Sequence, residues 1–288
     1  MQNEPIAASI EVSPKHALEM ADLDLIIPQG VRTYITDIGT HSTADMARGC
    51  ERLISFGLKA VPHIAARRLA DEAELEDKVR GYAAAGVTDV LVIGGGADRL
   101  QGEVHSTMQV LETGLFDAHG ITEIGVAGHP EGTPDFSDEV AEIALRLKKE
   151  FAERTGARMR IVTQFGFDAE KFVNWAEGLS KAGNDLPVHL GVAGPAKTMT
   201  LLKYAAMCGV GNSIGFLKKN AGAVTALAAS HSPESVVGPI EEHVQSAERT
   251  AIRGVHVFPF GGLQNTSRWL SERGSWPVLQ QMQAANRA

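Results

Sequence analysis

Eight short segments rich in valine and isoleucine recur along the chain, with amphipathic stretches between them. The segments are Ala7–Val12, Val31–Thr36, Leu58–Ile64, Asp89–Gly94, Glu123–Ala127, Met159–Gln164, Pro187–Gly191 and Gly254–Phe258. Most are continuously apolar, which is typical of strands buried on both faces of a parallel sheet. Eight such strands with helical crossovers in 288 residues predict an α/β fold, a single (β/α)8 TIM barrel that occupies residues 1–288 as one domain.

The stretches between the strands carry helix signals. Predicted helices cover Leu69–Ala85, Ser137–Arg154, Lys197–Cys208, Ala221–Ala229 and Glu234–Arg253. Asp71 can cap the first of these helices, and Gly86 follows its end. The alternative fold is an open doubly wound sheet, which is weakened because no G-x-G-x-x-G motif follows the first strand.

Composition excludes several classes of protein. The net charge of −8 argues against nucleic acid as a main partner, because binding phosphates requires a basic face. No apolar run approaches the roughly 20 residues of a membrane span, and the N-terminus carries no signal region. Cys50 and Cys208 lie far apart and form no metal-like pair, so they are interpreted as buried free thiols. These observations predict a cytoplasmic protein that does not bind membranes.

Polar residues at strand ends mark the predicted site, because the carboxyl ends of barrel strands build active sites. The sixth segment turns polar at Thr163 and Gln164, where an amide is costly without a partner. Asp168 can cap a helix that begins at Ala169. A carboxylate at Glu11, within the first strand, is interpreted as a general acid with a raised pKa. The alternative for Glu11 is a structural ion pair with a lysine or arginine.

Further candidates follow the other strands. Thr36 can donate to a ligand or serve only as a β-forming residue, and His63 can contact a cofactor or be a satisfied core histidine. The Gly94-Gly95-Gly96 run lets a flat ring or a phosphate approach the backbone, although it can also be a plain turn. Asp98 adds a charge at this mouth.

The fifth strand and the helix after it add a histidine and two lysines. His129 lies in a Gly/Pro-rich loop, and the ligand spacing there matches no zinc pattern. Lys148 can reach an anionic group, whereas Lys149 is better explained by a solvated helix face. Phe258 ends the last strand and suits a flat ligand. Without an obvious nucleophile, this inventory favours redox or one-carbon chemistry carried by an organic cofactor.

Five of these motifs resemble those of methylenetetrahydrofolate reductases. They are Ser9-Ile10-Glu11-Val12-Ser13-Pro14, Pro62-His63, Ala127-Gly128-His129-Pro130-Glu131, Thr163-Gln164-Phe165-Gly166-Phe167-Asp168 and Gly191-Val192-Ala193-Gly194-Pro195. The fourth motif is the most specific, and the order and spacing hold over about residues 6–215.

The resemblance implies an enzyme that binds FAD and moves a hydride from NADH or NADPH, through the flavin, to methylenetetrahydrofolate. It implies that Glu11 acts as the acid that helps to open the folate ring and that Gln164 contacts the pterin. It also implies a set of FAD contacts. These would be Thr36, His63, Gly94, Gly95, Gly96, Ala127, His129 and Lys148.

The chain departs from the family pattern after the fourth strand, where the family has Arg-Gly-Asp and this chain has Gly94-Gly95-Gly96. The role of the family's aspartate then falls to Asp98, the nearest acid. Gln164 and Phe258 remain as contacts for a tetrahydrofolate-type substrate. The departures affect the residues expected to contact the flavin and the nicotinamide more than they affect Glu11 and Gln164.

The leading hypothesis is a divergent methylenetetrahydrofolate reductase. One alternative is a tetrahydrofolate-dependent one-carbon or methyl-transfer enzyme on the same barrel, and another is a non-catalytic protein that binds folate or flavin. The apolar segment Ala221–Ala229 hints at a homo-oligomer interface.

Overall fold

Eight parallel strands have the order of a closed barrel in the computed structural model, which describes residues 5–96, 100–207, 210 and 230–277. The order around the barrel is β1-β10-β7-β6-β5-β4-β3-β2. The strands are β1 (Ala8–Val12), β2 (Arg32–Ile35), β3 (Lys59–Ala65), β4 (Asp89–Ile93), β5 (Glu123–Gly128), β6 (Arg158–Gly166), β7 (Val188–Ala193) and β10 (Ile252–Phe258). Each coincides with a predicted strand to within a few residues, so the predicted (β/α)8 fold is confirmed.

By its internal contacts the chain separates into two compact units. The N-terminal unit comprises residues 11–127 and 139–161, and the C-terminal unit comprises residues 1–10, 128–138 and 162–288. The division cuts β1, β5 and β6, so each of these strands contributes to both units. The assignment of residues 1–288 to one domain stays a prediction.

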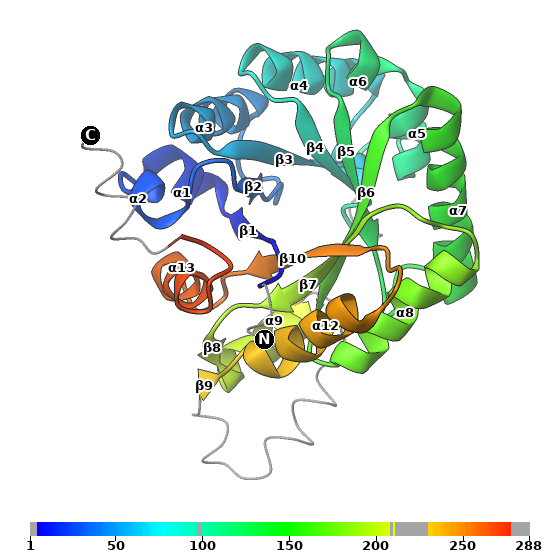
Figure 1. The fold of residues 1–288 in the computed structure, drawn as a ribbon. Helices are drawn as coiled ribbons and strands as arrows, with labels where there is room; N and C mark the ends of the chain where they lie inside the picture. Colours follow the sequence, from blue (N-terminus) through cyan, green and yellow to red (C-terminus); the bar gives the residue numbers. More distant parts are fainter. Residues whose placement is uncertain (1–4, 97–99, 208–209, 211–229, 278–288) are drawn as a thin grey trace. The chain divides into compact units, whose positions relative to one another are not determined.

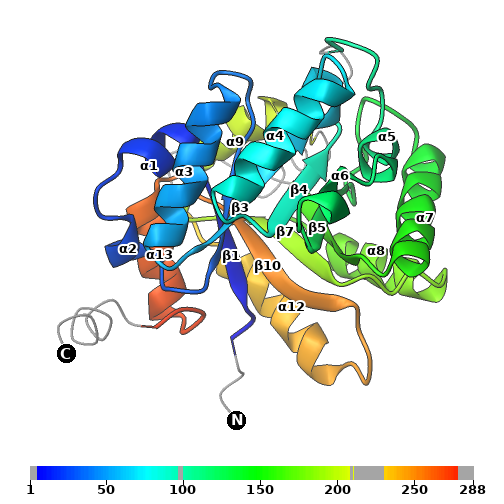
Figure 2. The same ribbon diagram turned by 90° about the horizontal axis from the view of Figure 1, so that it is seen from above.

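In the N-terminal unit, parallel strands are backed by amphipathic helices. The helices are α1 (Pro14–Glu19), α2 (Leu23–Ile26), α3 (Thr43–Ser55), α4 (Glu72–Ala84), α5 (Thr107–Glu112), α6 (Leu115–Ala118) and α7 (Asp138–Thr155), with a 3-10 turn η1 (Ala66–Arg68). Helices α3 and α4 lie side by side over β3 (Figures 1 and 2). The predicted cap is confirmed, because Oδ1 of Asp71 accepts a hydrogen bond from the backbone of Glu74 at 2.9 Å. Cys50 on α3 is a buried free thiol, as predicted.

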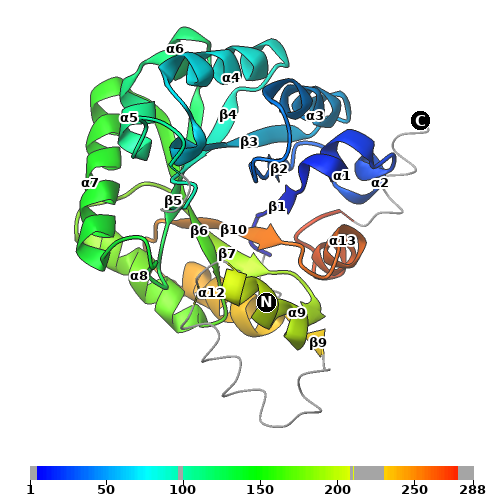
Figure 3. The ribbon, with the colours of Figure 1, turned by 180° about the vertical axis from the view of Figure 1, so that it is seen from behind.

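The C-terminal unit packs α8 (Ala169–Lys181) against α12 (Glu234–Ser246), as seen from behind in Figure 3. Asp168 caps α8 as predicted, through a 3.1 Å bond from the backbone of Lys171. Helices α9 (Thr198–Met207) and α13 (Leu263–Glu272) complete the described helices of this unit. Cys208 and Ala221–Ala229 lie outside the described residues.

Two details of the C-terminal unit differ from the sequence-based expectation. The helix predicted over Glu234–Arg253 ends at Ser246, because the backbone becomes extended at Ala247 and residues from Ile252 onward pair with β7 in the barrel. A short two-stranded antiparallel sheet of β8 (Ala196–Lys197) and β9 (Ser230–His231) was not expected. None of the helices in the described part of the chain is long and apolar enough to cross a membrane.

A buried polar network joins the starts of several strands in the N-terminal unit. The guanidinium of Arg160 on β6 donates to the hydroxyl of Tyr34 on β2 at 2.8 and 2.9 Å, and it pairs with Asp89 on β4 at 2.8 Å. Asp89 also accepts from Arg32 at 3.0 Å, and Arg32 reaches Glu123 on β5 at 2.6 Å. Arg160 and Asp89 are each 5% exposed, and Tyr34 is fully buried. In barrels of this class the amino-terminal end of the strands serves stability.

We expect Arg160→Met to destabilise the protein by about 3–5 kcal/mol, because it leaves Asp89 and Tyr34 buried without their main donor. The matched control is Arg154→Met, which breaks an exposed pair with Glu112 and should cost at most about 1 kcal/mol. Urea denaturation monitored by circular dichroism measures both free energies of unfolding. Equal losses in the two variants would show that the Arg160 network does not stabilise the fold.

Candidate active site

Two titratable side chains of the N-terminal unit, half-buried Glu11 on β1 and buried His63 on β3, form a close pair. Oε2 of Glu11 lies 3.7 Å from Nε2 of His63. Burial raises the pKa of Glu11 because it penalises the carboxylate, and the charge of His63 opposes that rise. A carboxyl group in this setting can hold a proton at a higher pH than an exposed one, as a general acid must.

The glycine run after β4 forms a turn that only glycine tolerates. Gly95 and Gly96 have φ values of +88° and +86°, in the left-handed region. A Cβ atom at Gly95 would lie 3.1 Å from the Cβ atom of Ala65. A side chain at residue 95 would therefore be strained and crowded, which explains the glycine there, while Asp98 lies outside the described residues.

Arg67 is a candidate residue that sequence reasoning missed. Its backbone N–H donates to the carbonyl oxygen of Gly94 at 3.0 Å, and its Nε donates to the carbonyl oxygen of His105 at 3.2 Å. A Cβ atom at Gly94 would lie 3.2 Å from Nη1 of Arg67, so the guanidinium lies directly beside the glycine turn. The Arg67-Arg68 pair just after the third strand was the signal that could have identified it.

Lys148 on α7 is a buried cation. The residue is 5% exposed, and burial lowers the pKa of its ammonium to about 8. The described residues give this ammonium no hydrogen bond or ion pair. Lys149, the half-buried neighbour of Lys148, pairs with Glu153 one turn further along the helix. Lys148 therefore has the character of an anion-binding lysine.

The remaining predicted cofactor contacts of the N-terminal unit are Thr36, just after β2, and Ala127 near the end of β5. Both are half-buried. The backbone N–H of Thr36 donates to the carbonyl oxygen of Val12 at 3.2 Å, which ties the end of β2 to β1. The N-terminal unit thus holds Glu11 and most of the residues expected to contact a flavin.

Gln164 lies in the C-terminal unit, in the interior of β6, because that strand continues to Gly166. Its Nε2 donates to the carbonyl oxygen of Gly132 at 3.1 Å, which satisfies part of the amide. The neighbouring Thr163 hydroxyl accepts a 2.8 Å bond from the backbone of Gly191 on β7. A Cβ atom at Gly191 would lie 2.3 Å from the carbonyl oxygen of Gln164, so these strands approach closely only because residue 191 is glycine.

Aromatic rings surround the end of β10 in the same unit. The ring centroid of Phe258 lies 5.6 Å from that of Phe165 and 5.7 Å from that of Phe260. Phe260 in turn stacks on Tyr204, with ring centroids 4.2 Å apart. His129, in the loop after β5, contacts the ring of Phe136 edge-on at 5.3 Å. Flat apolar surfaces near an amide suit a planar heterocycle.

The described residues contain no group of three or more His, Cys, Asp or Glu side chains placed to hold a metal ion.

Comparison with known proteins gives a consistent result. Residues 24–214 match the model of the methylenetetrahydrofolate reductase family, which is about two thirds of the chain. Glu11 and Phe258 lie outside that match.

Two curated relatives also match, over shorter stretches. Methylenetetrahydrofolate reductase 2 of Saccharomyces cerevisiae is 32% identical over 83 residues, which is 29% of this chain and 12% of that protein. Methylenetetrahydrofolate reductase 1 of Schizosaccharomyces pombe is 40% identical over 70 residues, 24% of this chain and 11% of that protein. The matches thus span only about an eighth of these relatives.

Among solved structures, that of 2,3-dimethylmalate lyase superimposes with a TM-score of 0.50 at 11% identity. The superposition covers 99% of this chain and 92% of the lyase. At this identity the likeness concerns the fold alone.

We expect Lys148→Met to stabilise the protein by about 1–3 kcal/mol at neutral pH, because it removes a buried charge whose pKa is depressed to about 8. The pKa of this lysine is lower in the folded than in the unfolded chain. The penalty is therefore complete below pH 8, and it disappears as the pH rises towards the ordinary value of 10.5. Urea denaturation between pH 7 and 10 measures the difference. Lys149→Met is the control, and an equal gain there would contradict the assignment of the penalty to Lys148.

Proposed function

The chain belongs to the methylenetetrahydrofolate reductase family, and from this premise we propose that it interconverts 5,10-methylenetetrahydrofolate and 5-methyltetrahydrofolate with FAD as its cofactor. The observation that carries the proposal is the close Glu11–His63 pair, which gives the site an acid whose pKa lies above the ordinary value. The known activity of the family requires such an acid. The match of the family model to about two thirds of the chain also supports the proposal.

The residues of the N-terminal unit fit a flavin dinucleotide. Lys148 offers a buried ammonium without a partner among the described residues, which suits a diphosphate. The turn at Gly94–Gly96 leaves room for a flat ring, and Arg67 supplies a guanidinium beside it. Thr36, His63 and Ala127 complete the proposed contacts.

Bound FAD supplies hydride transfer between NADH or NADPH and the one-carbon unit of the folate. The residues of the chain bind the folate and transfer one proton. Glu11 holds that proton on its carboxyl group and gives it to the ring nitrogen that is released when the five-membered ring of the folate opens. His63, 3.7 Å away, stabilises the carboxylate that remains.

Gln164 and Phe258 are the proposed folate contacts. The Oε1 atom of Gln164 accepts no hydrogen bond from the described residues, and its Nε2 is held by Gly132. A pterin edge offers N–H donors that match this acceptor. The rings of Phe258 and Phe165 provide an apolar wall for the flat heterocycle.

We expect the purified protein to be yellow with flavin absorbance, and Arg67→Met to weaken FAD binding by about 10–100-fold, because a hydrogen bond to a charged group is lost. Arg80→Met, which removes an exposed arginine paired with Asp77, is the control and should bind FAD normally. Titration of the apoprotein with FAD measures both affinities. A colourless protein that transfers methyl groups without nicotinamide would instead favour the methyl-transfer alternative. The glycine run after β4, where the family has Arg-Gly-Asp, is the observation that supports this alternative.

We expect Glu11→Gln to lower kcat by about 10²–10⁴ while retaining folate binding, because only the proton donor is removed. In the unmodified enzyme the rate should fall as the pH rises through the raised pKa of Glu11, and this limb of the pH profile should disappear in the variant. Steady-state kinetics across the acidic to mildly alkaline range test both points. Glu19→Gln, on the exposed face of α1, is the control, and near-normal turnover of the Glu11 variant would remove the acid assignment.

A further inference from the structure

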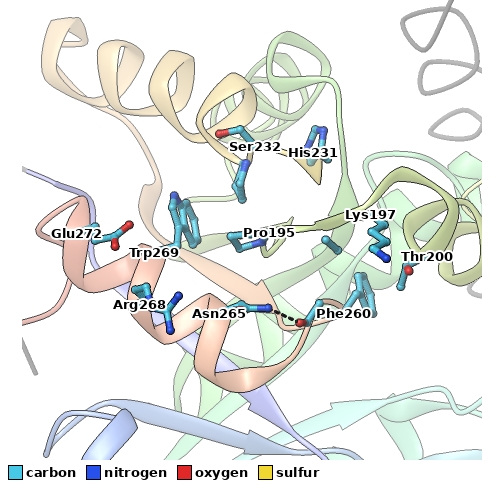
Figure 4. Close-up of a pocket in the computed structure, with 13 residues that line it drawn as sticks. Pro195, Lys197, Thr200, His231, Ser232, Phe260, Asn265, Arg268, Trp269 and Glu272 are labelled. Carbon is cyan, nitrogen blue, oxygen red and sulfur yellow. Dashed lines mark hydrogen bonds between the residues drawn. The ribbon is translucent and has the colours of Figure 1, made fainter. Parts of the chain in front are cut away.

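A cleft of about 720 Å³ opens in the C-terminal unit, where α13 lies opposite the two-stranded sheet of β8 and β9 (Figure 4). Trp269, Phe260 and Lys197 are among the residues that line it. Neither Glu11 nor His63 lines this cleft. The contacts that hold the proposed acid and its histidine in place lie elsewhere, inside the N-terminal unit.

Tyr34 on β2 contacts His63 in the interior of this unit. The two ring centroids lie 6.1 Å apart, and the rings meet edge to face with their planes at 74°. The strand register explains the contact, because Tyr34 lies opposite Val61 on β3 and His63 comes two residues later along that strand. Side chains two residues apart on a strand face the same side. Tyr34 therefore supports His63 from the side of the strand starts.

The other end of Tyr34 is held by charged residues. Its hydroxyl accepts hydrogen bonds of 2.8 and 2.9 Å from Arg160 on β6. Arg160 also pairs with Asp89 on β4 at 2.8 Å, and Arg32 on β2 joins Asp89 to Glu123 on β5. The ring of Tyr34 is fully buried, so it cannot move without breaking contacts to a network that joins several strands.

A tyrosine at this position does more than fill the interior of the barrel. Branched aliphatic side chains usually fill such interiors, and they need no hydrogen-bond partner. A buried hydroxyl is costly unless it is hydrogen-bonded, and here it is bonded to the arginine that joins the strand starts. Arg160, Tyr34, His63 and Glu11 thus form a continuous series of contacts from the strand starts to the proposed acid.

We propose that Tyr34 is a positioning residue, which holds the imidazole of His63 at its place beside the Glu11 carboxyl group and is itself held by Arg160. The inference rests on the proposed function only for the role of Glu11 as an acid, because the contacts are a property of the free protein. Tyr34 touches neither substrate nor cofactor in this account and acts through His63.

The position of His63 matters for the proton on Glu11. Burial raises the pKa of Glu11, and the charge of His63, 3.7 Å away, opposes that rise. A fixed histidine therefore limits how far the pKa of the acid rises. Burial also raises the pKa of Tyr34, so its hydroxyl stays protonated where Glu11 titrates and does not take part in that titration.

Carbon-13 NMR of the full chain, labelled at the glutamate carboxyl groups, tests the proposal. The signal of Glu11 is identified by its loss in Glu11→Gln. Tyr34→Leu should shift the titration midpoint of Glu11 to higher pH, because the released His63 no longer opposes the effect of burial. Water that enters the space left by the ring would shift the midpoint to lower pH instead. A fall, or an unchanged midpoint, would overturn the proposal.

A double variant shows whether Tyr34 acts through His63. His63→Gln removes the opposing charge and should also shift the midpoint of Glu11 to higher pH. When His63→Gln is combined with Tyr34→Leu, the shift should exceed that of His63→Gln alone by little, because both changes remove the same interaction. Shifts that simply add would show that Tyr34 affects Glu11 by another route and would contradict the proposal.

Tyr34→Phe is the conservative variant, since it keeps the ring and removes only the hydroxyl that Arg160 holds. It should shift the midpoint of Glu11 in the same direction as Tyr34→Leu but by less, and no shift would contradict the role given to Arg160. Tyr82→Leu is the matched control. Tyr82 is also fully buried in this unit, on α4, and its hydroxyl has no hydrogen-bond partner among the described residues. This control should lose stability without moving the midpoint, and an equal shift there would contradict a specific role for Tyr34.

Steady-state kinetics separates the failure of this inference from the failure of the proposed function. In Tyr34→Leu the fall of kcat at high pH should move to higher pH together with the NMR midpoint, while KM for the folate changes little. If the midpoint moves but the unmodified enzyme shows no such fall, the acid role of Glu11 is wrong and the positioning role of Tyr34 stands. If the unmodified enzyme shows the fall and Tyr34→Leu moves neither the fall nor the midpoint, the positioning role alone is wrong.

Discussion

The buried guanidinium of Arg160 is the interaction on which the N-terminal unit depends. It lies among the first residues of β6 and connects to β2 through Tyr34 and to β4 through Asp89, and Arg32 extends the network to β5. Every charge in this group has an opposite charge or a donor within hydrogen-bonding distance, so burial there is compensated. Because this polar network stabilises the starts of the strands, the residues at the other ends of the strands can serve the chemistry of the site. Glu11 is a polar residue near such a strand end.

Burial shifts the pKa values of Glu11 and Lys148 in opposite directions. Burial raises the pKa of the carboxyl group and lowers the pKa of the ammonium, so both groups are driven towards their neutral forms. An acid that keeps its proton is useful in catalysis, and an ammonium without a partner is useful only when an anion arrives. Both features lower the stability of the free protein.

The sequence predicted the elements of the fold better than the details of the site. All eight barrel strands were predicted because buried parallel strands leave continuous apolar runs, and Asp71 and Asp168 identified helix starts through local chemistry. The end of α12 was placed too late, because the amphipathic pattern continues past Ser246 while pairing with β7 decides where β10 begins. The two-stranded sheet of β8 and β9 joins segments far apart in the sequence, so no local pattern predicts it. The contact between Gln164 and Gly132 likewise depends on a loop whose path the sequence does not specify.

The glycine run after β4 lies against the segment that follows the neighbouring strand β3. The register of β3 and β4 places Ala65 opposite Ile93, so the chain leaves these two strands side by side, with Arg67 next to Gly94. A side chain at residue 94 would press on the guanidinium of Arg67, because a Cβ atom there would lie only 3.2 Å from Nη1. Glycine at 94 therefore leaves space for the guanidinium of Arg67, which comes from η1 directly after β3.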